Sequence, residues 1–223
     1  GERALLVHLD GQDSAAREDP QEFQELAISA GAETVAFFTV PSNRLTAKYL
    51  IGSGKVEDLR DQVKATEADL VICPFLKDRV PQQLWSNAKR PVVIIHPGIV
   101  GDRGASALDW AISKELKRWG VTALQAVEEM DAGPIWSTHE FNLPNGLRKS
   151  ELYNGLVSDA AIHCIRDVVE KFRNGFRPVP LDYDNPAVLG RLQPNMKQCD
   201  RTFSWHDCSR FIKRCIDAAT AIR

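Results

Sequence analysis

Short apolar runs, each as long as a β-strand, recur through the first 126 residues of the chain. They occupy residues 4–9, 34–40, 70–73, 92–95 and 121–126 and are rich in valine, isoleucine and leucine, without a regular alternation of apolar and polar positions. Strands buried on both faces of a parallel sheet have this composition. The pattern therefore predicts five strands of a mostly parallel sheet.

Helical patterns lie between these runs. Asp19-Pro20 followed by Glu22 has the cap, the proline and the capping-box acid of a helix start, and Gly31 follows the apolar stripe as a stop. Further apolar stripes predict a second helix over residues 56–63 and a third that ends at Trp119. Alternating strands and helices favour a Rossmann-like, doubly wound α/β fold.

The last third of the chain has a different pattern. Apolar residues at four-residue steps predict a long helix over residues 150–172. Residues 176–186 contain three prolines and interrupt regular structure, and a final amphipathic helix is expected after Ser204. We therefore expect a Pro-rich linker and a C-terminal helical extension of the sheet domain.

Composition narrows the class of protein. The 223 residues are 43% hydrophobic and 26% charged, with a net charge of -2, which gives no drive toward nucleic acid or a membrane surface. The N-terminal apolar run is too short for a secretion signal, so a cytoplasmic protein is expected. Five cysteines without C-x-x-C spacing favour reduced thiols over a disulfide framework or a zinc site.

Two side chains stand out as candidate chemistry. His96 closes the fourth apolar run and Asp131 follows the fifth. Ligands of open α/β sheets bind beyond the carboxyl ends of the strands, so we expect the two side chains to converge in one crevice. An imidazole can shuttle a proton near neutral pH or donate to an oxyanion, and a carboxylate can fix its tautomer.

From residue 73 onward the sequence resembles the folate-dependent formyltransferases, most closely the N-terminal part of the hydrogenase-maturation family HypX. Four blocks carry the resemblance in the family's order: CPFLKDRVP at 73–81, HPGIVGDRGASALDWAI at 96–112, WGVTALQAVEEMDAGPIW at 119–136, and PLDYDNPAVLGRLQPNMKQCDRTFSW at 180–205.

The first 72 residues instead resemble the N-terminal domain of the ribosome-associated GTPase family HflX. The signature is the spacing of KYLIGSGK at 48–55 against the helix that follows it. The full phosphate-binding loop pattern is absent there because Val56 stands in place of the serine or threonine, so a glycine-rich turn that caps the helix is favoured. No GTPase domain is recognisable.

The two resemblances imply a domain organisation. Residues 1–180 would form one Rossmann-like formyltransferase-type domain, with an HflX-like half (1–72) and a formyltransferase-like half (73–180), followed by the linker and helix at 181–223. The seam between Ile72 and Cys73 falls within a predicted strand. We hypothesise a recombination within one domain, by natural fusion or as an engineered chimera.

The formyltransferase resemblance also implies an activity. Its family moves a formyl group from 10-formyltetrahydrofolate, without a metal, and the HypX branch would make formyl-coenzyme A for [NiFe]-hydrogenase maturation. By resemblance His96 and Asp131 are catalytic. The implied substrate-binding residues are Phe75, Leu76, Lys77, Val80, Gly98, Asp102, Arg103, Gly104 and Gly133.

One departure from the family pattern bears on this activity. The wider family usually has an asparagine two residues before the histidine, and Ile94 stands there. Loss of one oxyanion donor costs about 10²–10³ in rate unless another replaces it. Arg103 or the backbone amides of residues 97–104 are candidate replacements.

Two other functions remain open on the sequence. The chain would be an inactive hybrid scaffold if the two halves share a sheet without a working site. If the HflX-like half dominates, it would be a ribosome- or nucleotide-binding module. Folate and coenzyme A are the partners expected on the first hypothesis, and the ribosome only on the last.

Overall fold

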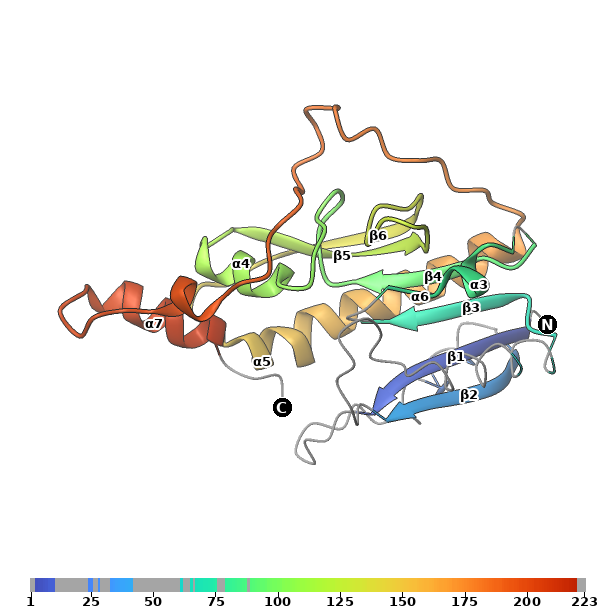
Figure 1. Ribbon diagram of the computed structural model, residues 1–223, viewed down its shortest axis with the longest axis horizontal. Coiled ribbons are helices and arrows are strands. Elements are labelled where there is room, and N and C mark those ends of the chain that lie inside the picture. The colour runs from blue at the N-terminus through green and yellow to red at the C-terminus, as the bar shows by residue number, and fades with distance from the viewer. Residues whose placement is uncertain are drawn as a thin grey trace.

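One mixed sheet of six strands organises the protein, whose computed structural model describes residues 3–10, 24–25, 28, 33–41, 61, 65, 67–75, 79–87 and 89–219 (Figure 1). The strands are β1 (Arg3–Asp10), β2 (Glu33–Pro41), β3 (Leu70–Pro74), β4 (Val92–His96), β5 (Arg118–Gln125) and β6 (Ile135–Asn142). Their order across the sheet is β2-β1-β3-β4-β5-β6. The predicted α/β class and all five predicted strands are confirmed, and β6 is an addition.

The first four strands run parallel to one another. Within this set, β3 lies at the boundary between the HflX-like and the formyltransferase-like parts of the sequence. Residues 70–72 of β3 pair with β1, in the register Ala4↔Leu70 to Leu6↔Ile72. Residues 71–74 pair with β4, from Val71↔Val92 to Pro74↔Ile95. The seam inferred from the sequence thus lies where β3 stops pairing with β1 and continues to pair with β4.

β5 runs antiparallel to both of its neighbours, β4 and β6. This corrects the expectation that residues 121–126 form a strand of the parallel set. The connection between β4 and β5 contains one short helix, α4 (Ala107–Ser113). A hydrogen bond from the indole of Trp119 to the carbonyl of Pro97 holds the start of β5 beside the end of β4, as an antiparallel pair requires.

Trp119 is also placed differently from the prediction. The apolar spacing put it in the third helix, but α4 ends at Ser113 and Trp119 is the second residue of β5. Glu115, with φ at 50°, turns the chain out of the helix. Trp119 is almost fully buried, and its Nε1 donates to the carbonyl of Pro97 at 2.9 Å. Burial against distant residues therefore decides its position.

A long helical segment covers one face of the sheet. It consists of α5 (Lys149–Leu152), a single π-helical turn η1 (Tyr153–Val157) and α6 (Ser158–Arg173), which confirms the helix predicted over residues 150–172. Its apolar stripe is buried against the sheet, and full burial of one such valine or leucine contributes about 1.5–3 kcal/mol. The stripe includes Leu152, Val157, Ala160, Cys164 and Val168.

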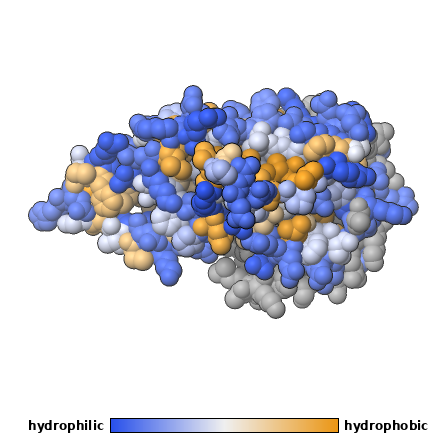
Figure 2. Space-filling model, turned by 90° about the horizontal axis from the view of Figure 1, so that it is seen from above, coloured by the Kyte–Doolittle hydropathy of each residue, from blue (hydrophilic) through white to orange (hydrophobic). Residues whose placement is uncertain are grey.

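The segment between α6 and the last two helical elements crosses the molecule without forming a helix or a strand. Residues 174–197 pass from the end of α6 over the upper side of the sheet and lead to the 3-10 turn η2 (Gln198–Arg201) and α7 (Ser209–Ala219), which packs on α4 (Figure 1). Viewed from above, hydrophobic residues gather in the middle of the face (Figure 2). Leu189 and Leu192 are among the exposed large hydrophobic residues.

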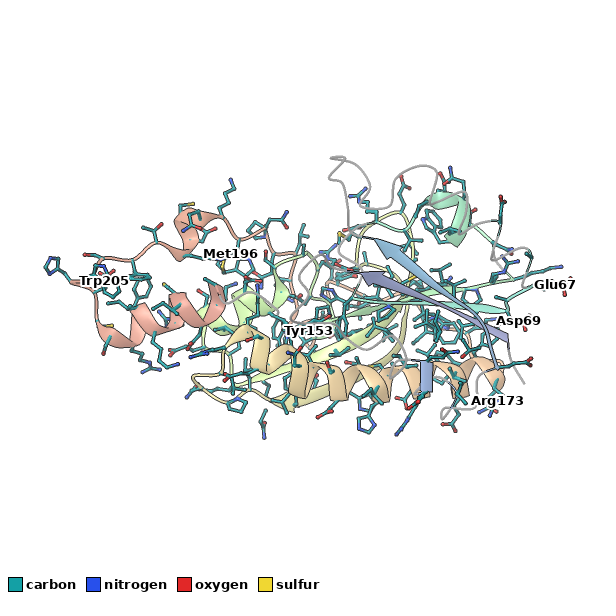
Figure 3. The ribbon with its side chains drawn as sticks, turned by 90° about the horizontal axis from the view of Figure 1, so that it is seen from below. Glu67, Asp69, Tyr153, Arg173, Met196 and Trp205 are labelled. Atoms are coloured by element: carbon teal, nitrogen blue, oxygen red, sulfur yellow. The ribbon has the colours of Figure 1, made fainter. Side chains whose placement is uncertain are left out.

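The two ends of the elongated molecule are well separated. Trp205 lies at the tip beside α7, whereas Glu67, Asp69 and Arg173 lie toward the opposite end, and Tyr153 marks the middle (Figure 3). The division into a domain at 1–180 and an extension at 181–223 stays a prediction. A further short helix, α3, spans Gln82–Trp85. The described helices include none with the length and apolarity needed to span a membrane.

Candidate functional site

His96 is the last residue of β4 and is only 5% exposed. Two carboxylates face its ring. Nε2 lies 3.0 Å from Oδ2 of Asp102, and Nδ1 lies 3.5 Å from Oδ2 of Asp131. Asp102 and Asp131 are themselves buried. The structure thus brings together the two predicted catalytic side chains and places beside them Asp102, which the sequence put among the substrate-binding residues.

These carboxylates set the charge of the imidazole. Burial disfavours the charged ring and lowers the pKa of His96, but the hydrogen bond with Asp102 and the negative charges of Asp131 and Asp102 outweigh burial. The net result is a pKa above the usual value. The two carboxylates therefore favour the charged, proton-donating form of the ring.

The loop after β4 holds the His96–Asp102 pair at close quarters. Gly98 packs against it so tightly that a Cβ there would lie 2.4 Å from Nε2 of His96 and 2.6 Å from Oδ2 of Asp102. The carbonyl of Gly98 accepts a hydrogen bond from Oγ1 of Thr122 at 2.8 Å. Gly98, predicted to bind substrate, thus packs directly against His96 and Asp102, and its role in substrate binding stays a prediction.

Asp131 reaches His96 by a route that the sequence did not predict. Because β5 is antiparallel, its last residue, Gln125, pairs with Val93 near the start of β4 rather than near His96. The loop between β5 and β6 folds back toward the end of β4, and there Oδ2 of Asp131 accepts the N–H of Gly104 at 3.2 Å. The expected convergence is found, but the carboxyl-end argument for it is wrong.

Close backbone packing shapes this loop as well. A Cβ at Gly133 would lie 1.7 Å from the carbonyl oxygen of Gln125, which excludes any side chain. Asp131 itself has a φ of 56°, in the left-handed region that few residues other than glycine, asparagine and aspartate adopt. A backbone held in such a conformation next to a candidate catalytic group is common at functional sites.

The linker contributes a segment to the same region, which we call the strap (residues 188–196). The N–H of Arg103 donates to the carbonyl of Arg191 at 3.2 Å, and the N–H of Gln193 donates to the carbonyl of Arg103 at 2.9 Å. The N–H of Gly190 donates to the carbonyl of Val100 at 3.1 Å. The strap thus fixes the loop that carries Asp102 and Arg103.

Arg103 and Asp102 are neighbours in the sequence but do not form a salt bridge with each other, because each pairs with another residue. Oδ2 of Asp102 lies within hydrogen-bonding distance of His96, so Asp102 can position the histidine, and its role in binding substrate stays a prediction. Arg103 pairs with Glu129 through Nη1 and lies 4.3 Å from the centre of the Tyr183 ring. Glu129 and Tyr183 were not predicted from the sequence, and no pattern around either residue indicated a site.

The predicted pterin pocket is only partly described. Phe75 follows β3 with a φ of 50°, its N–H donates to the carbonyl of Ile95 at 3.0 Å, and its ring packs 4.9 Å from that of Tyr153. Val80 is buried. Leu76 and Lys77 lie outside the described residues. Gly104, with a φ of 114°, packs against the carbonyl of Gln193.

Ile94 occupies the position expected for an amide donor. It is buried two residues before His96, and alternate residues of a strand share a face. An apolar side chain therefore stands beside His96 on that face. Among the described residues, no group of three His, Cys, Asp or Glu side chains is arranged to hold a metal ion.

Comparison with known proteins finds two kinds of relatives for this chain. Residues 17–85 match the family described as GTP-binding GTPase N-terminal. GTPase HflX of Escherichia coli is 39% identical over 72 residues, which are 32% of this chain and 17% of HflX. The sequence resemblance of the first half is confirmed.

The larger part of the chain is similar to hydrogenase maturation factors. Hydrogenase maturation factor HoxX of Bradyrhizobium diazoefficiens is 37% identical over 162 residues, which are 72% of this chain and 28% of HoxX. HypX from Aquifex aeolicus in complex with tetrahydrofolic acid superposes with a TM-score of 0.74 at 29% identity, over 97% of this chain and 34% of that one.

These matches confirm the predicted formyltransferase-like fold across nearly the whole chain, including the half whose sequence resembles HflX. The chain spans about a third or less of the length of these relatives.

Proposed function

We propose that this chain is a formyltransferase domain that takes a formyl group from 10-formyltetrahydrofolate and passes it to an acceptor, in the maturation of [NiFe]-hydrogenase. The observation that carries the proposal is His96 held between two buried carboxylates at the end of β4. The similarity to HoxX and to the tetrahydrofolic acid complex of HypX supplies the substrate class.

Formyl transfer places three demands on such a site. The acceptor attacks the formyl carbon, the carbonyl oxygen gains negative charge, and the bond from carbon to N10 of the folate breaks. The acceptor loses one proton and N10 gains one, so no net proton is consumed. A charged donor beside the developing oxyanion and a group that moves the proton are therefore required.

Burial lowers the pKa of His96, but the two carboxylates outweigh burial and favour the charged ring, so His96 is the candidate for the charged donor. Its Nε2 proton is shared with Asp102, and a formyl oxygen would compete with that carboxylate for the same proton. Asp131 contacts the other nitrogen, so it stabilises the imidazolium and orients the ring. Since Ile94 provides no amide, His96 would be the main side-chain donor.

The acceptor is proposed to be coenzyme A, whose thiol would yield formyl-coenzyme A. This assignment rests on the HypX resemblance stated for residues 73–223. Proton transfer from the thiol would be assisted by Asp102 once the formyl oxygen has replaced it at Nε2. Oδ1 of Asp102 is buried and has no partner among the described residues, so it is available to accept a hydrogen bond.

Calorimetry with tetrahydrofolate and a formyl-transfer assay test this function. We expect His96→Ala and Asp131→Asn to lower the transfer rate by about 10²–10⁴, the usual contribution of a positioned acid or base. His206→Ala, at an exposed histidine, is the matched control and should leave the rate unchanged. A cooperatively folded protein that binds no tetrahydrofolate would instead support an inactive scaffold.

A further inference from the structure

Arg103 is held in place by its main chain before any ligand arrives. Its N–H and its carbonyl oxygen are both hydrogen-bonded to the strap, on either side of a bridge with Leu192. Little conformational freedom therefore remains for binding to remove at this backbone position. The next residue, Gly104, donates its N–H to Asp131, so Arg103 lies at the edge of the candidate active site.

The guanidinium group is oriented as well. It lies over the ring of Tyr183 at 4.3 Å, a distance at which a cation is attracted to the face of an aromatic ring. Tyr183 comes from the linker and lies close enough to Glu129 and Asp131 for their charges to act on it. The plane of the arginine side chain is thus set by a residue from a distant part of the chain.

The hydrogen-bonding capacity of this oriented group is only partly used. Nη1 pairs with Glu129, but Nε is buried and finds no acceptor among the described residues. The arginine side chain is 18% exposed, whereas that of Glu129 is 62% exposed. An exposed carboxylate gains little from such a pair because water competes for it. Leaving a buried N–H unpaired carries its own cost.

We propose that Arg103 binds an oxyanion of a substrate at the edge of the active site, and that Glu129 is a built-in counter-ion which this oxyanion displaces. A carboxylate or phosphate in that place could accept from Nε and an Nη together, the geometry for which a guanidinium is suited. Tyr183 holds the guanidinium in the binding orientation.

The proposal rests on the proposed function only for the identity of the ligand. Two parts of the substrates carry the required chemistry: the glutamate carboxylates of the folate donor and the phosphates of a nucleotide-bearing acceptor. Glu129 is the informative position because its removal leaves Arg103 intact. Loss of a competing internal anion should strengthen substrate binding, an effect opposite to that of most damage to a site.

The experiment measures binding by calorimetry at low salt, with three probes: tetrahydrofolate, tetrahydropteroate, which lacks the glutamate, and inorganic pyrophosphate. We expect Glu129→Gln to tighten binding of the anionic probe by about 2–5-fold, the size of an exposed ion pair. Arg103→Lys should weaken it by roughly 10-fold or more, since a charged hydrogen bond is lost. Glu128→Gln, at the exposed neighbouring glutamate, is the matched control.

The three probes separate the two sources. A preference for tetrahydrofolate over tetrahydropteroate that disappears in Arg103→Lys assigns the site to the folate carboxylate. Pyrophosphate binding that disappears in the same variant assigns it to the acceptor. Tyr183→Phe should bind as the parent does, whereas Tyr183→Ala should lose about 3-fold in affinity with the ring.

The proposal is overturned if Glu129→Gln binds every anionic probe as tightly as the parent protein does, or more weakly. An unchanged affinity in Arg103→Lys would also overturn it. Failure of the proposed function is distinguishable, because the parent protein would then show no formyl transfer while the response of the bound anionic probe to Glu129→Gln would persist.

Discussion

Two loops each deliver a carboxylate to one side of the His96 ring, and together these carboxylates favour its charged form. Asp102 comes from the loop that follows β4, and Asp131 comes from the loop that joins β5 and β6. Each contact is buried, so solvent screens little of the attraction. The charge state of one side chain therefore depends on the folding of two segments that lie on either side of β5 in the sequence.

The pH dependence of stability follows from this arrangement. A group whose pKa is raised on folding contributes stability that is fully present below its unfolded pKa, near 6.5, and is lost as pH rises through the folded pKa. Asp102→Asn removes one of the two charges and should lower the pKa of His96. We expect denaturant unfolding to show a larger loss of stability in this variant at pH 6 than at pH 9.

Proton NMR of the His96 ring measures the same effect directly, since the titration midpoint should move downward in Asp102→Asn. An unmoved midpoint would mean that Asp131 alone determines the charge of His96.

Gly98 offers a test of how tightly the pair is packed. Gly98→Ala would place a methyl group within 2.4 Å of Nε2 of His96. We expect the His96–Asp102 contact to break, with a loss of about 1–3 kcal/mol in stability from overpacking. Gly155→Ala is the matched control, because nothing lies within 4 Å of a Cβ there. Thermal unfolding of both variants, with the His96 titration, decides the matter.

At the scale of elements, the strap turns a linker into part of the site. Residues 188–196 bond to the loop after β4 at several points along it, from Val100 to Ser106. The indole of Trp110 in α4 donates to the carbonyl of Pro194 in the strap at 2.7 Å. Loop, helix and strap should therefore loosen together rather than one at a time.

Gly190 is the closest point of this contact. A Cβ there would lie 2.0 Å from the backbone nitrogen of Asp102, so Gly190→Ala should lift the strap from the loop. We expect faster hydrogen exchange at the amides of Arg103, Gly190 and Gln193 together. The amides of α6 serve as the internal reference and should keep their protection. Exchange that changes at Gly190 alone would show that the strap does not act as a unit.

The sequence predicts some of these elements better than others. The five strands and the long helix carry local signals, namely buried β-branched runs and apolar residues at four-residue steps, and their predicted bounds lie close to the observed ones. The antiparallel turn into β5 and the strand position of Trp119 depend on long-range packing. Asp102 and Tyr183 gain their roles only through contacts made by the folded chain.

At the scale of the whole molecule, segments that resemble two different families contribute strands to one sheet. Among the residues whose burial the structure describes, one hydrophobic core runs from β3 across β4, β5 and β6 to α4 and α6. Leu6 of β1 is fully buried. β3 pairs with β1 on one side and with β4 on the other, and so connects β1 to the remainder of the sheet. Such a sheet is expected to unfold as one cooperative unit.

Cysteine labelling under native conditions tests this cooperativity. Burial raises the pKa of Cys73 in β3 and of Cys164 in α6 to about 12, so neither should react while the protein is folded. Cys199 and Cys208 are exposed and would react in the folded protein, so both are replaced by serine before the experiment. We expect Cys73 and Cys164 to become reactive at the same denaturant concentration.

Earlier labelling of Cys73 would mean that the halves separate between β1 and β3 before the core opens. The two thiols are then reporters of two units rather than one.

The register of β3 gives this protein a natural crossover point for exchanging gene segments. The hydrogen bonds between strands join backbone groups, which nearly all residue types share. β3 pairs with β1 through residues 70–72 and with β4 through residues 71–74, so segments from two sources can meet within β3 and keep both sets of backbone hydrogen bonds. The catalytic candidates His96 and Asp131 both lie downstream of that point. A library of foreign N-terminal cassettes joined at Ile72 could therefore be screened with the downstream chemistry held constant.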